Sequence, residues 1–221
     1  MWWFDKGRQS EGYYVKAARL CNSTAKTLLG EYYHLGRVAE KNDKIAFKWY
    51  LKAAKQEQVD AMLNVGVFYA NGFGVKQNYK KAFDWYWNVA DAGSVEAMFN
   101  IGTLFERGYI EQNDEAAFNC YLKAAKKGYP EALHKLGCFY MNGQFVDKDI
   151  NRARELFNLA CERGFIESYL PLGNLYYYYE PYDYDTGLKC FEIAAEINEP
   201  NGLNNLGIAL QDGKACEPNH Y

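Results

Sequence analysis

The chain has 221 residues, of which 49% are hydrophobic, and its formal net charge is −3. This composition is ordinary for a globular protein, and so weak a net charge excludes a strong electrostatic attraction to nucleic acid or to an anionic membrane. No apolar run is long enough to cross a bilayer, and residues 1–14 lack the apolar core of a signal peptide. We therefore expect a cytoplasmic protein with no membrane insertion and no nucleic-acid partner. The alternative is a periplasmic or secreted protein whose leader has been removed.

Helical segments alternate with short turns along the whole chain. The first predicted helix covers residues 10–19, and the second runs near residues 25–35, after a capping segment at residues 22–24. In the stretch 46–75, apolar residues recur at helical spacing in two runs that a short turn separates. The second run ends at an Asn-Gly turn. Later segments repeat this design, but the aromatic segment 176–184 stands where a glycine turn is expected. The pattern predicts a series of helix–turn–helix units.

Three columns of small residues recur in one common register. They are the glycines of each second helix, the small residues five positions earlier, and the residues that end each KAA-like tripeptide: Gly30, Gly66, Gly102, Gly137, Gly173, Gly207; Ala25, Ala61, Ala97, Ala132, Ser168, Gly202; Ala18, Ala54, Ala90, Ala125, Cys161, Ala195. Neighbouring positions differ by 36, 36, 35, 36 and 34 residues in every column. A fixed period of this size is typical of stacked repeats, and two helices per repeat predict an all-α solenoid of antiparallel helix pairs.

The register predicts one repeat domain, 1–221. Its units are a partial first unit at 1–21, repeats at 22–57, 58–93, 94–128, 129–164 and 165–198, and a truncated last unit at 199–221. No polar capping repeat is evident at the C-terminal end, so we expect either a fragment of a longer array or a partner that covers that end.

Two aromatic columns share the register and are predicted to fill the space between helices. Their members are Tyr14, Tyr50, Tyr86, Tyr121, Phe157, Phe191; Tyr33, Tyr69, Phe105, Tyr140, Tyr176. Aromatic residues that keep the period of the fold are expected to be core before they are ligand contacts.

The pattern of residues 61–93 resembles the Sel1-like repeat, a relative of the tetratricopeptide repeat with a longer loop between its helices. The positions that carry the resemblance are Ala61, Val65, Gly66, Tyr69, Gly72, Gly74, Lys81, Ala82, Trp85, Tyr86, Ala90 and Gly93. The match extends over nearly the whole chain. The resemblance implies a right-handed superhelix without a cofactor and a scaffold or adaptor role in a bacterial or signalling assembly, although the function itself must be argued from a site.

The chain has no motif that indicates catalysis. His34, His134 and His220 are scattered, the first two in different columns of non-adjacent units, so no shared metal is expected. Neither a phosphate-binding loop nor a hydrolase motif appears. We expect no enzymatic activity, no catalytic residue, no cofactor and no metal site. Two alternatives stay open. One is an immunity or inhibitor protein that wraps a cognate toxin, and the weaker one is a β-lactam-type hydrolase, as proposed for disulfide-bearing relatives.

The six cysteines follow no regular pattern. In secreted members of the family that the chain resembles, a cysteine in the tripeptide column pairs with another cysteine eight residues later. Cys161 occupies that column, but Tyr169 stands eight residues further on. This irregular use favours buried thiols and a reducing compartment, although two cysteines that meet only in the fold are not excluded.

By analogy with the tetratricopeptide repeat, the helix that begins at each small residue lines the groove that holds a partner protein or peptide. The predicted partner-binding positions lie three, six or ten residues after the small residue: Asn64, Asn100, Lys135, Asn174, Arg107, Tyr178. Asparagine amides both donate to and accept from a peptide backbone, so Asn64 and Asn100 are candidates to clamp an extended ligand. The alternative is a polar helix face without a ligand. Asn71 and Asn142 precede glycines and are interpreted as helix caps.

The segment 176–184 adds tyrosines that match no regular aromatic column. Tyr177, Tyr178, Tyr179, Tyr182 and Tyr184 are expected to be partly displayed, and Tyr182 joins the predicted partner-binding residues. Tyrosine buries much area at low entropic cost, which is why it is common at binding hot spots. The alternative is that these tyrosines pack on one another and cover the loop.

Overall fold

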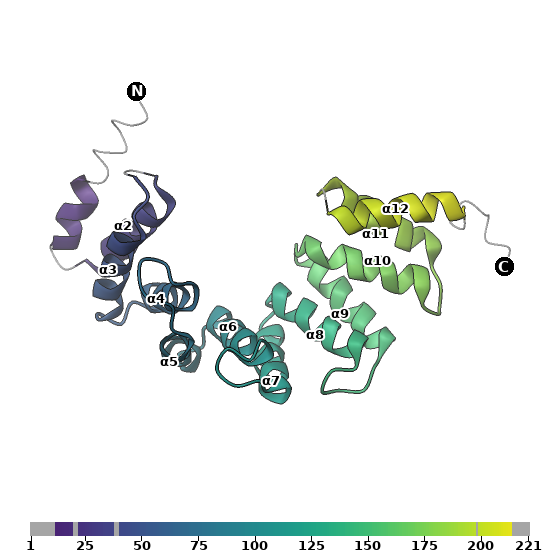
Figure 1. Cartoon of the computed structure of the whole chain (residues 1–221), viewed down its shortest axis with the longest axis horizontal. Coiled ribbons are helices and arrows are strands. Elements are labelled where there is room, and N and C mark those ends of the chain that lie inside the picture. The colour runs from purple at the N-terminus through teal and green to yellow at the C-terminus, as the bar shows by residue number, and fades with distance from the viewer. Residues whose placement is uncertain (1–11, 20–21, 38–39, 198, 214–221) are drawn as a thin grey trace, which may run out of the picture. The chain divides into compact units, whose positions relative to one another are not determined.

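The computed structural model describes residues 12–19, 22–37, 40–197 and 199–213. Every regular element in these ranges is helical, as Figure 1 shows, which confirms the predicted all-α class. The chain divides into two units between Asn113 and Asp114. The predicted start of the first helix at residue 10 and the end of the last unit at 214–221 lie outside the described residues.

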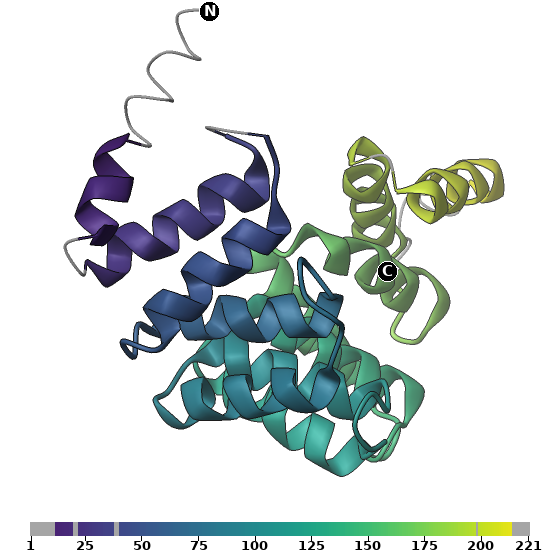
Figure 2. The same cartoon turned by 60° about the vertical axis from the view of Figure 1, so that its left-hand side comes forward.

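The first unit begins with a helical segment at residues 12–19 and continues with α2 (Ser23–Leu35), α3 (Asp43–Ala54), α4 (Val59–Asn71), α5 (Tyr79–Asp91) and α6 (Val95–Glu106). The second unit contains α7 (Asp114–Lys126), α8 (Pro130–Asn142), α9 (Ile150–Glu162), the 3₁₀ turn η1 (Ile166–Ser168), α10 (Tyr169–Tyr178), α11 (Tyr184–Glu196) and α12 (Pro200–Asp212). Within each unit, helices that follow one another in sequence pack side by side, as the second view in Figure 2 also shows. This is the helix-pair stacking of a solenoid.

Side chains and glycines fix the helix ends. The Asn22 side chain accepts a hydrogen bond from the Ala25 amide at 2.8 Å, which confirms the predicted cap, and Asn78 does the same for the Lys81 amide at 2.9 Å. These contacts satisfy amides that the first helical turn leaves unpaired. At the end of α4 the cap is Gly72, which is left-handed with φ of 74°. Asn71 is the last helical residue, so the interpretation of Asn71 itself as the cap was wrong. Its amide donates back to the Val67 carbonyl at 2.9 Å.

The glycine column and the first aromatic column fit into one another. A Cβ added to Gly66 would lie 2.5 Å from a ring carbon of Tyr86, and Gly30, Gly137 and Gly173 meet Tyr50, Phe157 and Phe191 in the same way. In these four pairs, an aromatic ring therefore fills the notch that a glycine leaves in the preceding helix. The rings are buried, and burial raises the pKa of the Tyr50 and Tyr86 phenols. The predicted core role of this column is confirmed for these pairs.

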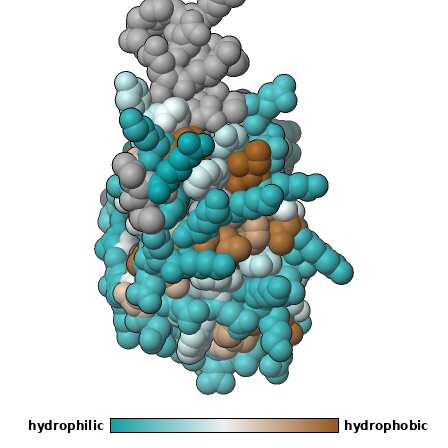
Figure 3. Space-filling model, turned by 90° about the vertical axis from the view of Figure 1, so that its left-hand side faces the viewer, coloured by the Kyte–Doolittle hydropathy of each residue, from teal (hydrophilic) through white to brown (hydrophobic). Residues whose placement is uncertain are grey.

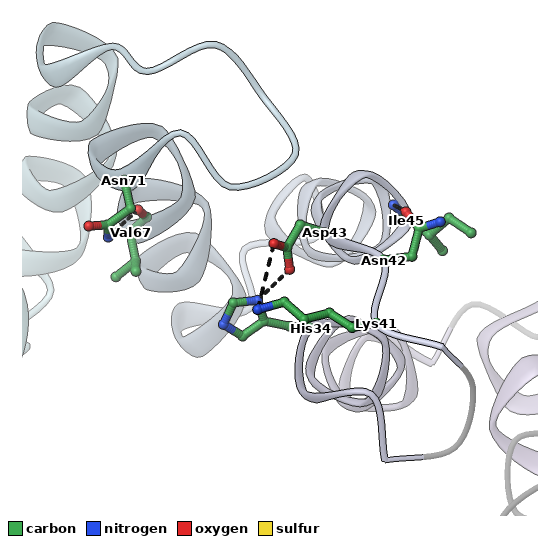
Figure 4. Close-up of polar contacts among 7 residues, drawn as sticks. All are labelled: His34, Lys41, Asn42, Asp43, Ile45, Val67 and Asn71. Carbon is green, nitrogen blue, oxygen red and sulfur yellow. Dashed lines mark hydrogen bonds and ion pairs between the residues drawn. The ribbon is translucent and has the colours of Figure 1, made fainter.

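A polar contact joins the two helices of the first described repeat. Figure 4 shows His34 from α2 and Asp43 from the start of α3 pointing toward each other, with 2.7 Å between Nδ1 and Oδ1. The His34 ring also lies 5.0 Å from the ring of Phe68 and 5.2 Å from that of Phe73, centre to centre. His34 therefore links its own helix pair to α4 and the loop after it, which is a structural role.

Packing buries one tyrosine of the segment 176–184 that the sequence predicts to be displayed. Tyr177 is only 1% exposed, with its ring 5.8 Å from that of Phe191, so its predicted display was wrong. The physical reason is that Tyr177 extends the apolar face of α10 toward α11. Tyr178 and Tyr182 are 45% and 50% exposed, and the Tyr182 ring stacks on Tyr184 at 5.6 Å. The segment therefore combines one core tyrosine with displayed tyrosines that pack partly on one another.

The side chain of Arg154 on α9 holds the backbone of this segment. Arg154 is only 8% exposed, and its Nη2 lies 2.9 Å from the Leu175 carbonyl oxygen and 3.3 Å from that of Tyr179. Its guanidinium lies 4.9 Å from the centre of the Tyr176 ring. A planar cation with several donors can satisfy carbonyls at the end of a helix that has no glycine cap.

Candidate protein-binding face

A polar pocket of about 340 Å³ lies between α4, α5 and α6 in the first unit. Its lining comprises Ala70, Asn71, Gln77, Tyr79, Tyr86, Asn100, Thr103, Leu104, Arg107 and Tyr109. Asn100, Thr103, Asn71 and Arg107 come from the columns three, six and ten residues after the small residue. The lining thus combines Asn71, from the end of α4, with three positions of the next repeat, at Asn100, Thr103 and Arg107.

A hydrogen-bonded wall closes one side of this pocket. The amide of Gln77 donates to the Ala70 carbonyl at 2.7 Å and to the Tyr79 hydroxyl at 2.9 Å. The Tyr79 ring stacks on Tyr109, with 4.1 Å between ring centres and 5° between planes. These contacts connect the end of α4, the start of α5 and the loop after α6. They also fix the positions of Tyr79 and Tyr109 without a ligand.

The same two tyrosines also border a second pocket. It has a volume of about 630 Å³ and is lined by Tyr79, Lys80, Phe83, Asp84, Phe105, Tyr109, Ile110 and Glu111. The tyrosine pair thus borders two linings, one largely polar and one that mixes apolar rings with charged groups. A partner segment that crosses the pair would meet both kinds of surface.

The formal charge in the lining of the first pocket is the guanidinium of Arg107. Arg107 donates to the Tyr109 hydroxyl at 3.2 Å. This hydrogen bond lowers the pKa of Tyr109, because a positively charged donor stabilises the phenolate. Burial is the main cause that raises the pKa of Tyr79. The guanidinium of Arg107 thus places a charged hydrogen-bond donor in this lining, of the kind that binds a carboxylate or a carbonyl oxygen.

The other predicted partner-binding residues lie elsewhere. Asn64 is on α4, where its amide donates to the Asp60 carbonyl of its own helix at 2.9 Å. In the second unit, the Asn174 side-chain oxygen accepts from the Asn205 amide at 2.8 Å, and Lys135 lies half-buried on α8. Tyr178 and Tyr182 are exposed together at the end of α10 and in the loop that follows. Only Asn100 and Arg107 of the predicted set line the polar pocket.

Sequence reasoning missed Gln77, Tyr79 and Tyr109. All three lie at or beyond the helix ends, outside the groove columns. A usable signal was present, because Tyr79 and Tyr109 are aromatic at positions where the repeat does not keep an aromatic residue. Their stacking across two repeats depends on the loop path, which the period does not specify.

The described residues bear on two further requirements, those of a metal site and those of a membrane-spanning helix. Within the described ranges, no three His, Cys, Asp or Glu side chains gather as a metal site. None of the described helices combines the length and apolar character needed to cross a bilayer. Cys120, Cys138, Cys161 and Cys190 are thiols, while Cys21 and Cys216 lie outside the described residues. Figure 3 shows one face on which hydrophilic side chains separate small apolar patches.

Solved structures share this architecture. A protective antigen of uropathogenic Escherichia coli with an SLR fold is 28% identical over 93% of this chain, with a TM-score of 0.84. The chain spans only 44% of that protein's length. A Sel1 repeat protein from Oxalobacter formigenes is 32% identical, with a TM-score of 0.78, over 89% of this chain and 80% of its own. No curated protein matches the chain.

A third solved structure is similar in fold alone. The immunity protein Pa5087 of Pseudomonas aeruginosa is 22% identical over 88% of this chain and 68% of its own, with a TM-score of 0.55. The family comparison is more specific. The Sel1 repeat model matches residues 23–57, 59–93, 95–129, 130–165 and 168–198, which is most of the chain. These matches coincide with the helix pairs and with the register of the small-residue columns, so the chain belongs to the Sel1 repeat family.

Proposed function

We propose that this chain is a non-catalytic scaffold that binds a partner protein, with the polar pocket around Asn100 and Arg107 as one contact site. Sel1 repeat proteins generally serve as scaffolds for protein interactions, which supports the general class of function. The observation that carries the specific site is that two consecutive repeats place amide, hydroxyl and guanidinium groups in one pocket beside stacked tyrosines. Such groups can bind an extended peptide backbone, and rigid tyrosines are common in binding surfaces.

The partner segment expected here is extended and carries a carboxylate or an exposed backbone carbonyl. Arg107 supplies the charge, and the Asn100 amide offers both a donor and an acceptor. The toxin-binding alternative receives no separate support, because the likeness to the immunity protein is one of fold.

The test is quantitative capture of partner proteins from the native cell by the full chain and by paired variants. The double variant Asn100→Ala with Arg107→Ala is expected to weaken binding by at least about tenfold, since a hydrogen bond to a charged group contributes roughly 1.5–3 kcal/mol. The matched control, Asn88→Ala with Arg152→Ala, removes the same residue types from exposed positions outside this pocket. Equal loss of the partner in both double variants, or undiminished binding in the first, would contradict the proposal.

A further inference from the structure

The second unit contains a thiol next to an imidazole, apart from the pocket proposed for partner binding. His134 and Cys138 lie one turn apart on α8, and the distance from Nε2 to Sγ is 3.6 Å. The other ring nitrogen, Nδ1, lies 2.8 Å from the Ser168 hydroxyl oxygen. Ser168 is at the end of η1 and is 0% exposed. Both nitrogens of His134 therefore have a defined neighbour.

Aromatic contacts fix the plane of this imidazole. The His134 ring lies 5.3 Å from the ring of Phe157 and 5.1 Å from that of Phe165, centre to centre. A ring packed against two others and hydrogen-bonded at Nδ1 has little freedom to rotate, so Nε2 stays toward Cys138. When Nδ1–H donates to the Ser168 oxygen, Nε2 is the nitrogen that accepts a proton.

Cys138 differs from the other described cysteines in its surroundings. It is half-buried and packs against an apolar cluster that contains Cys161 and Cys190. The titratable side chains that pack against the same cluster are Tyr140, Tyr169 and Tyr176. Burial raises the pKa of both Cys161 and Cys190 to about 12. Burial also raises the pKa of Cys120. Those three thiols stay protonated near neutral pH and serve as internal controls, because the thiolate is the nucleophile.

We propose that Cys138 is a reactive thiol, activated by His134, that exchanges with small-molecule disulfides. The Cys138 proton passes to Nε2 of His134, and the thiolate attacks one sulfur of the disulfide. A new S–S bond forms to Cys138 while the original S–S bond breaks. The leaving thiolate takes the proton from His134 and departs as a thiol, so protons and electrons balance. Ser168 is a positioning residue that accepts from Nδ1–H of the imidazolium.

The first test is alkylation of the full chain by iodoacetamide over a range of pH, with mass spectrometry reading each cysteine separately. Near neutral pH, Cys138 is expected to react at least about tenfold faster than Cys120, Cys161 and Cys190. His134→Gln should slow Cys138 about tenfold near neutral pH and move the pH of half-maximal rate upward. The plateau at high pH should not change, because there the thiol ionises without help and the rate reports accessibility alone.

A second variant guards against loss of folding. Ser168→Ala restores the residue that most other repeats have in this column, so the fold should be retained. It should slow Cys138 by a smaller factor than His134→Gln. The proposal fails if Cys138 in the native chain reacts no faster than in the urea-unfolded chain, or if His134→Gln leaves the pH profile unchanged.

The exchange itself is tested with glutathione disulfide under native conditions. A single mixed disulfide at Cys138, removed by dithiothreitol and absent from Cys138→Ser, is the expected product. A faster adduct at Cys120, Cys161 or Cys190, or no adduct at Cys138, overturns the assignment. This readout does not involve the partner protein, so it is independent of whether the pocket at Asn100 and Arg107 binds one.

Discussion

At the scale of single residues, the glycine column shows how one missing Cβ sets the spacing between helices. Gly66 and Gly207 occupy the same position in different repeats, but their surroundings differ. A Cβ at Gly66 would meet the Tyr86 ring at 2.5 Å, whereas a Cβ at Gly207 would meet nothing within 4 Å. The same substitution should therefore have opposite effects at the two positions.

Gly66→Ala should destabilise the chain by about 1–3 kcal/mol, because Tyr86 must move from a buried, well-packed site. Gly207→Ala should stabilise it by up to about 1 kcal/mol, because alanine is the better helix former and no contact opposes it. Urea unfolding followed by circular dichroism measures both. Equal shifts of the same sign would show that ring-in-notch packing does not determine the cost.

At the scale of elements, the loop between α10 and α11 depends on a side chain from α9. Arg154 donates to carbonyls at the end of α10, a helix whose cap residue, Tyr179, is in extended conformation. In most other repeats the second helix ends at a glycine cap, for example Gly72 after α4 and Gly143 after α8. The buried guanidinium of Arg154 thus stands in for the left-handed glycine cap at the end of α10.

Arg154→Lys should lower the free energy of unfolding by about 2–3 kcal/mol, because lysine keeps the charge but cannot donate to several carbonyls in one plane. The exposed neighbour Arg152, which pairs with Glu155 at 2.7 Å, gives the control: Arg152→Lys should change stability by less than about 0.5 kcal/mol. Thermal unfolding with tyrosine near-UV dichroism measures both. A small effect at Arg154 would mean that the loop is held by its tyrosines alone.

At the scale of the whole molecule, the helices within each unit contact their sequence neighbours, so stability should be a sum of local terms. Destabilisation at one repeat should then spread little along the chain. In Gly66→Ala, amide hydrogen exchange should accelerate most in α4 and α5 and least in α11 and α12. Uniform acceleration over all helices would instead indicate a single cooperative unit.

The repeat period, the pairing of helices and the aromatic core column were all predictable from the amino-acid sequence. Each repeat packs against similar repeats, so glycines and the aromatic rings that pack on them, such as Gly66 and Tyr86, recur at one spacing. That spacing can be recognised in the amino-acid sequence. The pairing of Asn100 with Arg107 in one concavity follows from the same helical spacing. These features depend on contacts within a repeat or between adjacent repeats, and such contacts produce a periodic pattern of residues in the sequence.

Only the tertiary structure decided the features that break the period. The stack of Tyr79 on Tyr109 depends on two loop paths, and the burial of Tyr177 depends on how α10 turns toward α11. His134 and Cys138 are four residues apart and their contact on one helix face was foreseeable, but the third member, Ser168, comes from the next repeat. Contacts between repeats at non-periodic positions depend on the exact orientation of single side chains, and no spacing in the sequence records that orientation.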